Sequence, residues 1–274
     1  MEFDSPEEAY DFVSKDCAVY SNCFETNPGF SGGKTWKQAL ECLRVGDTTY
    51  LSKAQKLIDE MTDQNLFSSG QEIFNPDIVG ILPCVPHYLM GQPDTMFNYE
   101  KTEIASVTTP IKIYLDSVVS AGVTPAAITS RGICLLGLIM ALKQVRPIEL
   151  HCVSVTSSRL LHHRVGGASY KIETNPIDLA RSTYMLCDAA FLRVNTFAVL
   201  YKTLGLDANI AARDTLPWAF GGYSDGVKYE QNIRRLFSMD DNDVFITGMR
   251  LHDHLAQTNP VAWVKRELVK YSEL

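Results

Sequence analysis

Residues 110–155 read PIKIYLDSVVSAGVTPAAITSRGICLLGLIMALKQVRPIELHCVSV. The short apolar run at Ile111–Leu115 predicts a strand, and Thr124-Pro125 then starts a helix that runs to about Gln144. Residues 132–142, inside that helix, carry no charged side chain. We therefore expect other parts of the protein to cover this helix on most sides, as the central helix of the fold.

A second strand follows the central helix. Pro147 ends the helix, and Ile148–Val155 is rich in β-branched and apolar residues, which favours a buried strand. Strand, helix and strand form a βαβ unit, whose crossover is almost always right-handed. The sequence thus predicts two neighbouring parallel strands joined by a buried helix.

The remaining C-terminal residues continue this alternation. We expect a weaker strand, a helix that is broken near Cys187-Asp188, a last short strand and a closing amphipathic helix. In chain order these are Tyr170–Glu173, a helix from Asn175-Pro176 that resumes at Phe191–Leu204, Asp243–Thr247 and a helix from Asn259-Pro260. Alternation of this kind predicts an α/β core at residues 106–274, with a mainly parallel, doubly wound sheet.

Residues 1–105 have a different pattern. Capping residues and apolar spacing predict helices here, at residues 5–13, 36–43 and 47–61, with Thr35 as the cap of the second. Residues 64–108 are rich in proline and glycine, which indicates an irregular hairpin or lid. We expect a helical N-terminal extension and a lid, both packed on the core.

Composition narrows the classes of function. The 274 residues carry a net charge of −7, which disfavours general binding to polyanions. The amino terminus lacks the features of a secretory signal, and the seven cysteines contain no CxxC pair. The apolar stretch at 132–142 is shorter than the roughly 20 residues needed to cross a bilayer. These features predict a cytoplasmic protein without a membrane span.

One motif follows the first strand of the core. In such sheets ligands bind beyond the carboxyl ends of the strands, where this chain has Asp116-Ser117-Val118-Val119-Ser120. This loop resembles the metal-adhesion loop Asp-x-Ser-x-Ser of von Willebrand A-type domains. Asp116 and Ser120 match the outer positions of that pattern, whereas Val118 replaces the middle serine.

The resemblance extends to two later loops. The segment at residues 221–225 is similar to a loop in which the family usually offers a threonine, with Ser224 as the substitute hydroxyl. Phe245-Ile246-Thr247-Gly248 is similar to the late strand, but Gly248 stands where the family usually has an aspartate. With two oxygen ligands missing, the resemblance implies a degenerate site at which Asp116, Ser120 and Ser224 hold Mg²⁺ weakly.

An incomplete metal site on this scaffold predicts an interaction or recruitment protein rather than an enzyme. The expected contact surface lies at the carboxyl ends of the strands and contains Asp116, Ser117, Ser120, Thr247 and Arg250. The order of elements is also similar to uncharacterised A-domain-like proteins of bacteriophages and bacteria, which implies a phage accessory factor with a protein partner.

A basic loop supports an alternative function. Arg159, His162, His163, Arg164 and Lys171 lie between two predicted strands, and such side chains contact phosphates in nucleic acids. This loop would then serve in phage transcription or replication. The plain alternative is a solvated loop that keeps an edge strand from pairing.

Three further patterns resemble a catalytic or ligand-binding motif, but each lacks a feature that the motif requires. Residues 222–226 read G-x-S-x-G, without the strand and helix that a nucleophile elbow needs. Gly33-Lys34-Thr35 ends like a phosphate loop, yet Pro28 occupies the position of its first glycine, so a helix-capping turn is favoured. His252-Asp253-His254 offers metal ligands but no third partner is identifiable.

Overall fold

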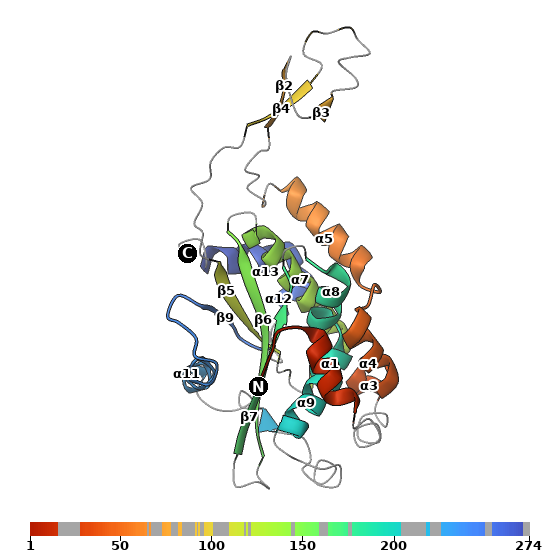
Figure 1. Cartoon of the computed structure of the whole chain (residues 1–274), viewed down its shortest axis with the longest axis vertical. Coiled ribbons are helices and arrows are strands. Elements are labelled where there is room, and N and C mark those ends of the chain that lie inside the picture. The colour runs from red at the N-terminus through yellow and green to blue at the C-terminus, as the bar shows by residue number, and fades with distance from the viewer. Residues whose placement is uncertain are drawn as a thin grey trace.

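The computed structural model is an α/β protein in which helices surround a mixed sheet (Figure 1). The structure describes part of the chain, and all statements below concern those residues. They are residues 1–15, 28–64, 66, 73–77, 82–83, 91, 93, 96–100, 110–117, 119, 122–143, 146–158, 164–174, 177–203, 218–219, 226–249 and 254–270.

The main sheet has the strand order β1-β7-β6-β5-β9, and β8 also pairs with β6. Its strands are β1 (Glu2–Phe3), β5 (Ile111–Asp116), β6 (Ile148–Ser158), β7 (Arg164–Ile172), β8 (Trp218–Ala219) and β9 (Val244–Ile246). Central β5 is parallel to both β6 and β9, and β1 is parallel to β7. The prediction of an α/β fold with a mostly parallel sheet is confirmed.

The strand β7 departs from parallel order because it follows β6 after a short connection. Such a connection returns the chain in the opposite direction, and β6 and β7 pair antiparallel from Leu150–Ile172 to Ser158–Arg164. Both strands are longer than the sequence predicted. The predicted strand at Tyr170–Glu173 corresponds to the end of β7. β7 is not an edge strand, because β1 pairs with it at Ser169 and Tyr170.

The central helix is α7 (Pro125–Lys143), as the sequence predicted. The Thr124 side chain accepts a hydrogen bond from the N–H of Ala127, which caps its first turn. The helix is long and apolar enough to span a membrane, but 72% of its apolar window is buried inside the protein. This burial is typical of the core helix of a soluble protein.

Helices cover both faces of the main sheet (Figure 1). One face packs on a core that extends from Phe3 to Val264 and includes α7, α8 (Leu179–Cys187) and the π-helix η1 (Phe191–Asn195). On the other face, the helix α11 (Gly226–Leu236) and the residue that follows it pack against β5 and β6. The remaining C-terminal helices are α9 (Thr196–Thr203), α12 (Leu255–Thr258) and α13 (Pro260–Lys270).

The N-terminal residues differ from the prediction at their start. The sequence predicted no strand ahead of the helix at residues 5–13, whereas Glu2–Phe3 form β1 beside Ser169 and Tyr170. The helices follow as α1 (Pro6–Ser14), α3 (Pro28–Ser31), α4 (Trp36–Val45) and α5 (Leu51–Asp63). α5 starts later than predicted because the Asp47 carboxylate accepts hydrogen bonds from Thr49, which fixes a turn ahead of it.

A second, smaller sheet lies in the region where the sequence predicted an irregular hairpin or lid. It has the order β2-β4-β3 and is antiparallel, with β2 (Ile73–Asp77), β3 (Leu82–Pro83) and β4 (Met96–Glu100). It lies apart from the main sheet in Figure 1. The predicted domain boundary at residues 105 and 106 lies outside the described residues and stays a prediction.

Candidate functional site

The candidate site lies where the parallel strands β5 and β9 end. The backbone N–H of Gly248 donates a 3.1 Å hydrogen bond to Oδ2 of Asp116, across 132 positions of sequence. An isolated parallel bridge between Val119 and Met249 continues the pairing beyond these two residues. The two loops that the sequence singled out therefore meet at one edge of the sheet, here called the rim.

Two of the predicted contact residues are buried at this rim. Asp116 is 5% exposed and Ser117 is 4% exposed. The Ser117 hydroxyl and backbone N–H both donate to the carbonyl oxygen of Val153, at 2.9 and 2.8 Å. Neither residue offers much surface to a partner, because both are used to join strands. Thr247, in contrast, is exposed.

A buried arginine supports the exposed part of the rim. Arg131 projects from α7, and its guanidinium donates a hydrogen bond to the carbonyl oxygen of Thr247. The neighbouring residue, Gly248, is held by Asp116. The backbone at 247 and 248 is thus fixed by two charged side chains, while the Thr247 side chain faces solvent.

The other predicted rim residues, Ser120, Ser224 and Arg250, lie outside the described residues. Asp116 is therefore the one residue of the predicted magnesium site that can be placed. One of its oxygens accepts the Gly248 N–H, at the position where the resemblance would put a second carboxylate. Within the described part of the chain, no three His, Cys, Asp or Glu side chains form a group that could hold a metal ion.

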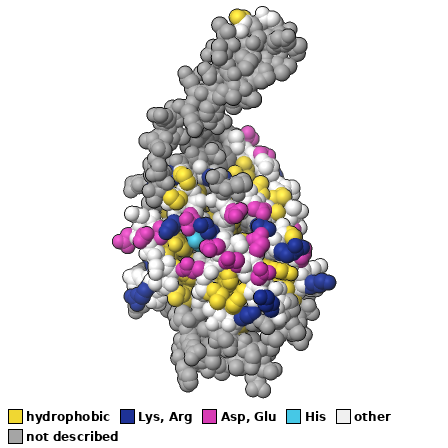
Figure 2. All heavy atoms as spheres, viewed as in Figure 1, with side chains coloured by type: hydrophobic (Ala, Val, Ile, Leu, Met, Phe, Trp, Pro, Cys, Tyr) yellow, Lys and Arg dark blue, Asp and Glu magenta, His cyan; other side chains and the backbone are white. Residues whose placement is uncertain are grey.

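The predicted basic loop is described only at its end. Arg159, His162 and His163 lie outside the described residues, and Arg164 begins β7. Lys171 lies on β7 with its ammonium 3.8 Å from Glu149, which offsets part of its positive charge. Acidic and basic side chains are interspersed over the face shown in Figure 2.

The sheet also carries a hydrogen-bonded chain of three side chains that the sequence analysis missed. Ser169 Oγ lies 3.3 Å from Nδ1 of His151, and Nε2 of His151 lies 2.8 Å from Oε1 of Glu149. The Tyr114 ring stacks on the imidazole at 4.9 Å between centroids. Burial raises the pKa of Tyr114 to about 12, so its phenol stays protonated at neutral pH.

This chain has the order of a nucleophile, a base and an orienting carboxylate, but it does not form an active site. Ser169 is 3% exposed, and its backbone N–H already donates to the carbonyl oxygen of Met1. A catalytic serine needs access for its substrate and free donors for the developing oxyanion. We interpret the three side chains as a cross-strand network that stabilises β6 and β7.

The turn that ends in Gly33-Lys34-Thr35 is a helix cap, as predicted. The Thr35 hydroxyl accepts from the N–H of Gln38, and the Gln38 side chain accepts from the N–H of Thr35. The Lys34 ammonium lies 2.6 Å from Asp188 and 2.8 Å from Asp47. Burial alone would lower the pKa of Lys34, but these two carboxylates raise it. Lys34 is thus engaged in a part-buried ion pair.

Comparison with known proteins gives one match. The model of a family described as a domain of unknown function, DUF7192, matches residues 1–269. The chain belongs to this family. No curated protein and no solved structure matches the chain. The DUF7192 match spans the N-terminal helices, both sheets and nearly all of the C-terminal helix, so it does not divide the chain.

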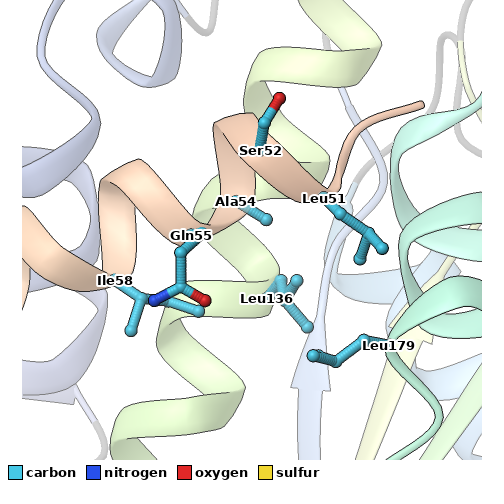
Figure 3. Close-up of a pocket in the computed structure, with 7 residues that line it drawn as sticks. All are labelled: Leu51, Ser52, Ala54, Gln55, Ile58, Leu136 and Leu179. Atoms are coloured by element: carbon cyan, nitrogen blue, oxygen red, sulfur yellow. The ribbon is translucent and has the colours of Figure 1, made fainter. Parts of the chain in front are cut away.

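This DUF7192 chain also has an apolar hollow of about 290 Å³ between α5, α7 and α8 (Figure 3). Four of its lining side chains are Leu51, Ile58, Leu136 and Leu179. The polar side chains Ser52 and Gln55 lie on its α5 side. The volume of the hollow lies just below the size range of ligand sites in proteins, about 300–1,000 Å³. It is separate from the rim.

Proposed function

We propose that this protein is a non-enzymatic interaction or recruitment protein, built on a von Willebrand A-like sheet, that binds a protein partner through its rim. The observation that carries the proposal is the hydrogen bond between Asp116 and Gly248. It brings together the two loops that the resemblance assigns to one binding site. In the proposed setting of a phage accessory factor, the partner is a protein of the host cell.

The chemistry of the rim supports contact rather than metal-dependent catalysis. Magnesium in proteins takes near-ideal octahedral oxygen coordination. At Gly248 the chain offers a backbone N–H donor instead of a carboxylate oxygen. We propose that any Mg²⁺ at Asp116 is held weakly, and that the rim acts through its shape and its exposed polar groups.

The rigidity of the rim also suits a contact surface. Binding loops commonly stand on a rigid scaffold, which lowers the entropy lost when a partner binds. Arg131 and Asp116 fix the backbone at residues 247 and 248 by hydrogen bonds. Thr247 can then present its side chain in a constant position.

Replacing Thr247 by arginine should therefore abolish recovery of the partner without unfolding the protein. The longer, charged side chain would obstruct the rim, whereas the exposed position leaves the core unchanged. The measurement is affinity purification from host cells, after nuclease treatment, with the wild-type protein and Thr247→Arg. Circular dichroism and the melting temperature confirm the fold.

Thr62→Arg is the matched control, because Thr62 is an exposed threonine on α5. Proteins bound at the rim should be retained by Thr62→Arg and lost with Thr247→Arg. Recovery of the same set with both variants would refute the proposed surface. Loss of all binding on nuclease treatment alone would favour the basic loop and nucleic acid instead.

A further inference from the structure

The π-helix η1 carries a buried arginine that contacts two separate segments. Single-turn π-helices are rare and occur often at functional sites. Arg193 is 1% exposed. Its Nη2 donates to the carbonyl oxygen of Val123 at 2.6 Å, and its Nη1 donates to that of Phe30 at 3.2 Å. One guanidinium thus joins two backbone carbonyls that are far apart in sequence.

These carbonyls belong to two segments with different places in the fold. Val123 ends the loop that leaves β5 at the rim, just before α7. Phe30 lies in α3, ahead of the turn that places Lys34 against Asp188. Asp188 in turn accepts the N–H of Ala190 at the start of the segment that forms η1. The rim loop, η1 and the N-terminal turn therefore form a continuous set of contacts.

The side chain of Phe30 adds a second contact with the same arginine. The guanidinium carbon lies 4.8 Å from the centroid of the Phe30 ring, and the Phe197 ring stacks on Phe30 at 6.1 Å. A planar guanidinium can donate in two directions while it lies over a ring, which a lysine ammonium cannot reproduce. The arrangement is thus specific for arginine.

We infer that Arg193 is a positioning residue that couples the rim loop to the turn at residues 28–34, so that the two segments open and close together. This inference rests on the proposed function in one respect, namely that the rim loop is part of the contact surface. It adds a form of regulation, because a ligand that displaced the turn would also loosen the rim loop at Val123, where Arg193 holds it. Such coupling requires a shared element whose state both segments influence, and η1 is that element.

Hydrogen exchange measured by mass spectrometry tests the coupling on the full chain. In Arg193→Lys one of the two carbonyl contacts is lost, so opening should become about tenfold more frequent. Exchange should accelerate both in residues 28–34 and in residues 122–128, while α13 stays unchanged. Acceleration in one of the two segments alone would overturn the inference.

Arg234→Lys is the matched control. Arg234 also donates to two carbonyls, those of Asp240 and Asp243, each at 3.2 Å, but both belong to one turn. Its loss should accelerate exchange in residues 240–243 and leave the rim loop unchanged. The control separates coupling of two segments from the local effect of losing an arginine.

A second variant keeps the test decisive if Arg193→Lys does not fold. Phe30→Leu removes the ring contact from the turn without changing a charge, and should accelerate exchange in residues 122–128 severalfold. In the Arg193→Lys background the same change should add little there. An unchanged rim loop in Phe30→Leu would contradict the inference. No partner is needed, so these outcomes are independent of the purification with Thr247→Arg.

Discussion

Replacing Gly132 by alanine should lower the free energy of unfolding by about 3 kcal/mol. An added Cβ at Gly132 would lie 2.2 Å from the carbonyl oxygen of Leu186 and 2.6 Å from Cα of Cys187. Both atoms belong to the backbone of α8, so α7 and α8 would have to move apart. Alanine by itself favours a helix over glycine by about 1 kcal/mol, so the packing effect opposes the intrinsic preference. Urea denaturation measures the difference.

Gly137→Ala on the same helix is the control for this prediction. Its added Cβ would meet the Met61 sulfur at 2.9 Å and Cδ2 of Leu57 at 3.4 Å. Methionine is flexible and can move aside, so the helix preference should largely offset the crowding. Equal losses of stability in the two variants would show that backbone contact between α7 and α8 is not the cause.

Replacing Asp188 by alanine should cost about 3–5 kcal/mol of stability, the range for breaking a buried ion pair. The Asp188 carboxylate accepts hydrogen bonds from Lys34 at 2.6 Å, from the Tyr50 hydroxyl at 3.0 Å and from the N–H of Ala190 at 2.7 Å. The substitution removes all three. It should detach the N-terminal turn from η1 as well as destabilise the core, which urea denaturation and limited proteolysis would detect.

Asp178→Ala is the matched control for Asp188. Asp178 also caps a helix, since its side chain accepts from the N–H of Arg181 at 3.0 Å. Its ion pair with the Arg181 guanidinium, at 3.5 Å, is partly exposed, unlike that of Asp188. Loss of such a cap costs about 1 kcal/mol. If Asp188→Ala were no more destabilising than Asp178→Ala, the ion pair would have no role beyond capping.

The central βαβ unit could be predicted because its signals are local. Thr124 and Pro125 fix the start of α7, and the run without charge at residues 132–142 predicts its burial. The predicted break near Cys187-Asp188 is also present, and its cause is that Asp188 ends α8 and caps the next helical segment. Caps and periodicity act over a few residues, so they can be read without a structure.

Contacts between distant segments could not be predicted in this way. The sequence predicted a helix cap at Thr35, which is confirmed, but nothing local indicates that Lys34 pairs with Asp188, 154 positions away. For the same reason the edge strand β1 was missed, since Glu2–Phe3 become a strand only beside β7. Neither the turn at Lys34 nor the pair Glu2–Phe3 has an apolar periodicity that would have predicted these contacts.

The positions of the two rim loops could be predicted, whereas their role as a binding site stays a prediction. The sequence placed Asp116 at the end of the first core strand and Thr247 at the end of the last, and the structure brings the two loops together. It could not show that Asp116 and Ser117 are buried. For the cross-strand network, the i,i+2 spacing of Glu149 and His151 on a predicted strand was the available signal. Ser169 fell just outside the strand predicted for residues 170–173.

The position of β1 in the sheet has a consequence for how the chain acquires its structure during synthesis. Glu2 and Phe3 pair with Ser169 and Tyr170, which are synthesised more than 160 residues later, so β1 cannot form until β7 has emerged from the ribosome. Pairings between distant segments are slow to form and leave a strand edge exposed meanwhile. We expect a nascent chain that is stalled before residue 170 to be protease-sensitive around residues 2–3, and one that is stalled after the sheet is complete to be protected there.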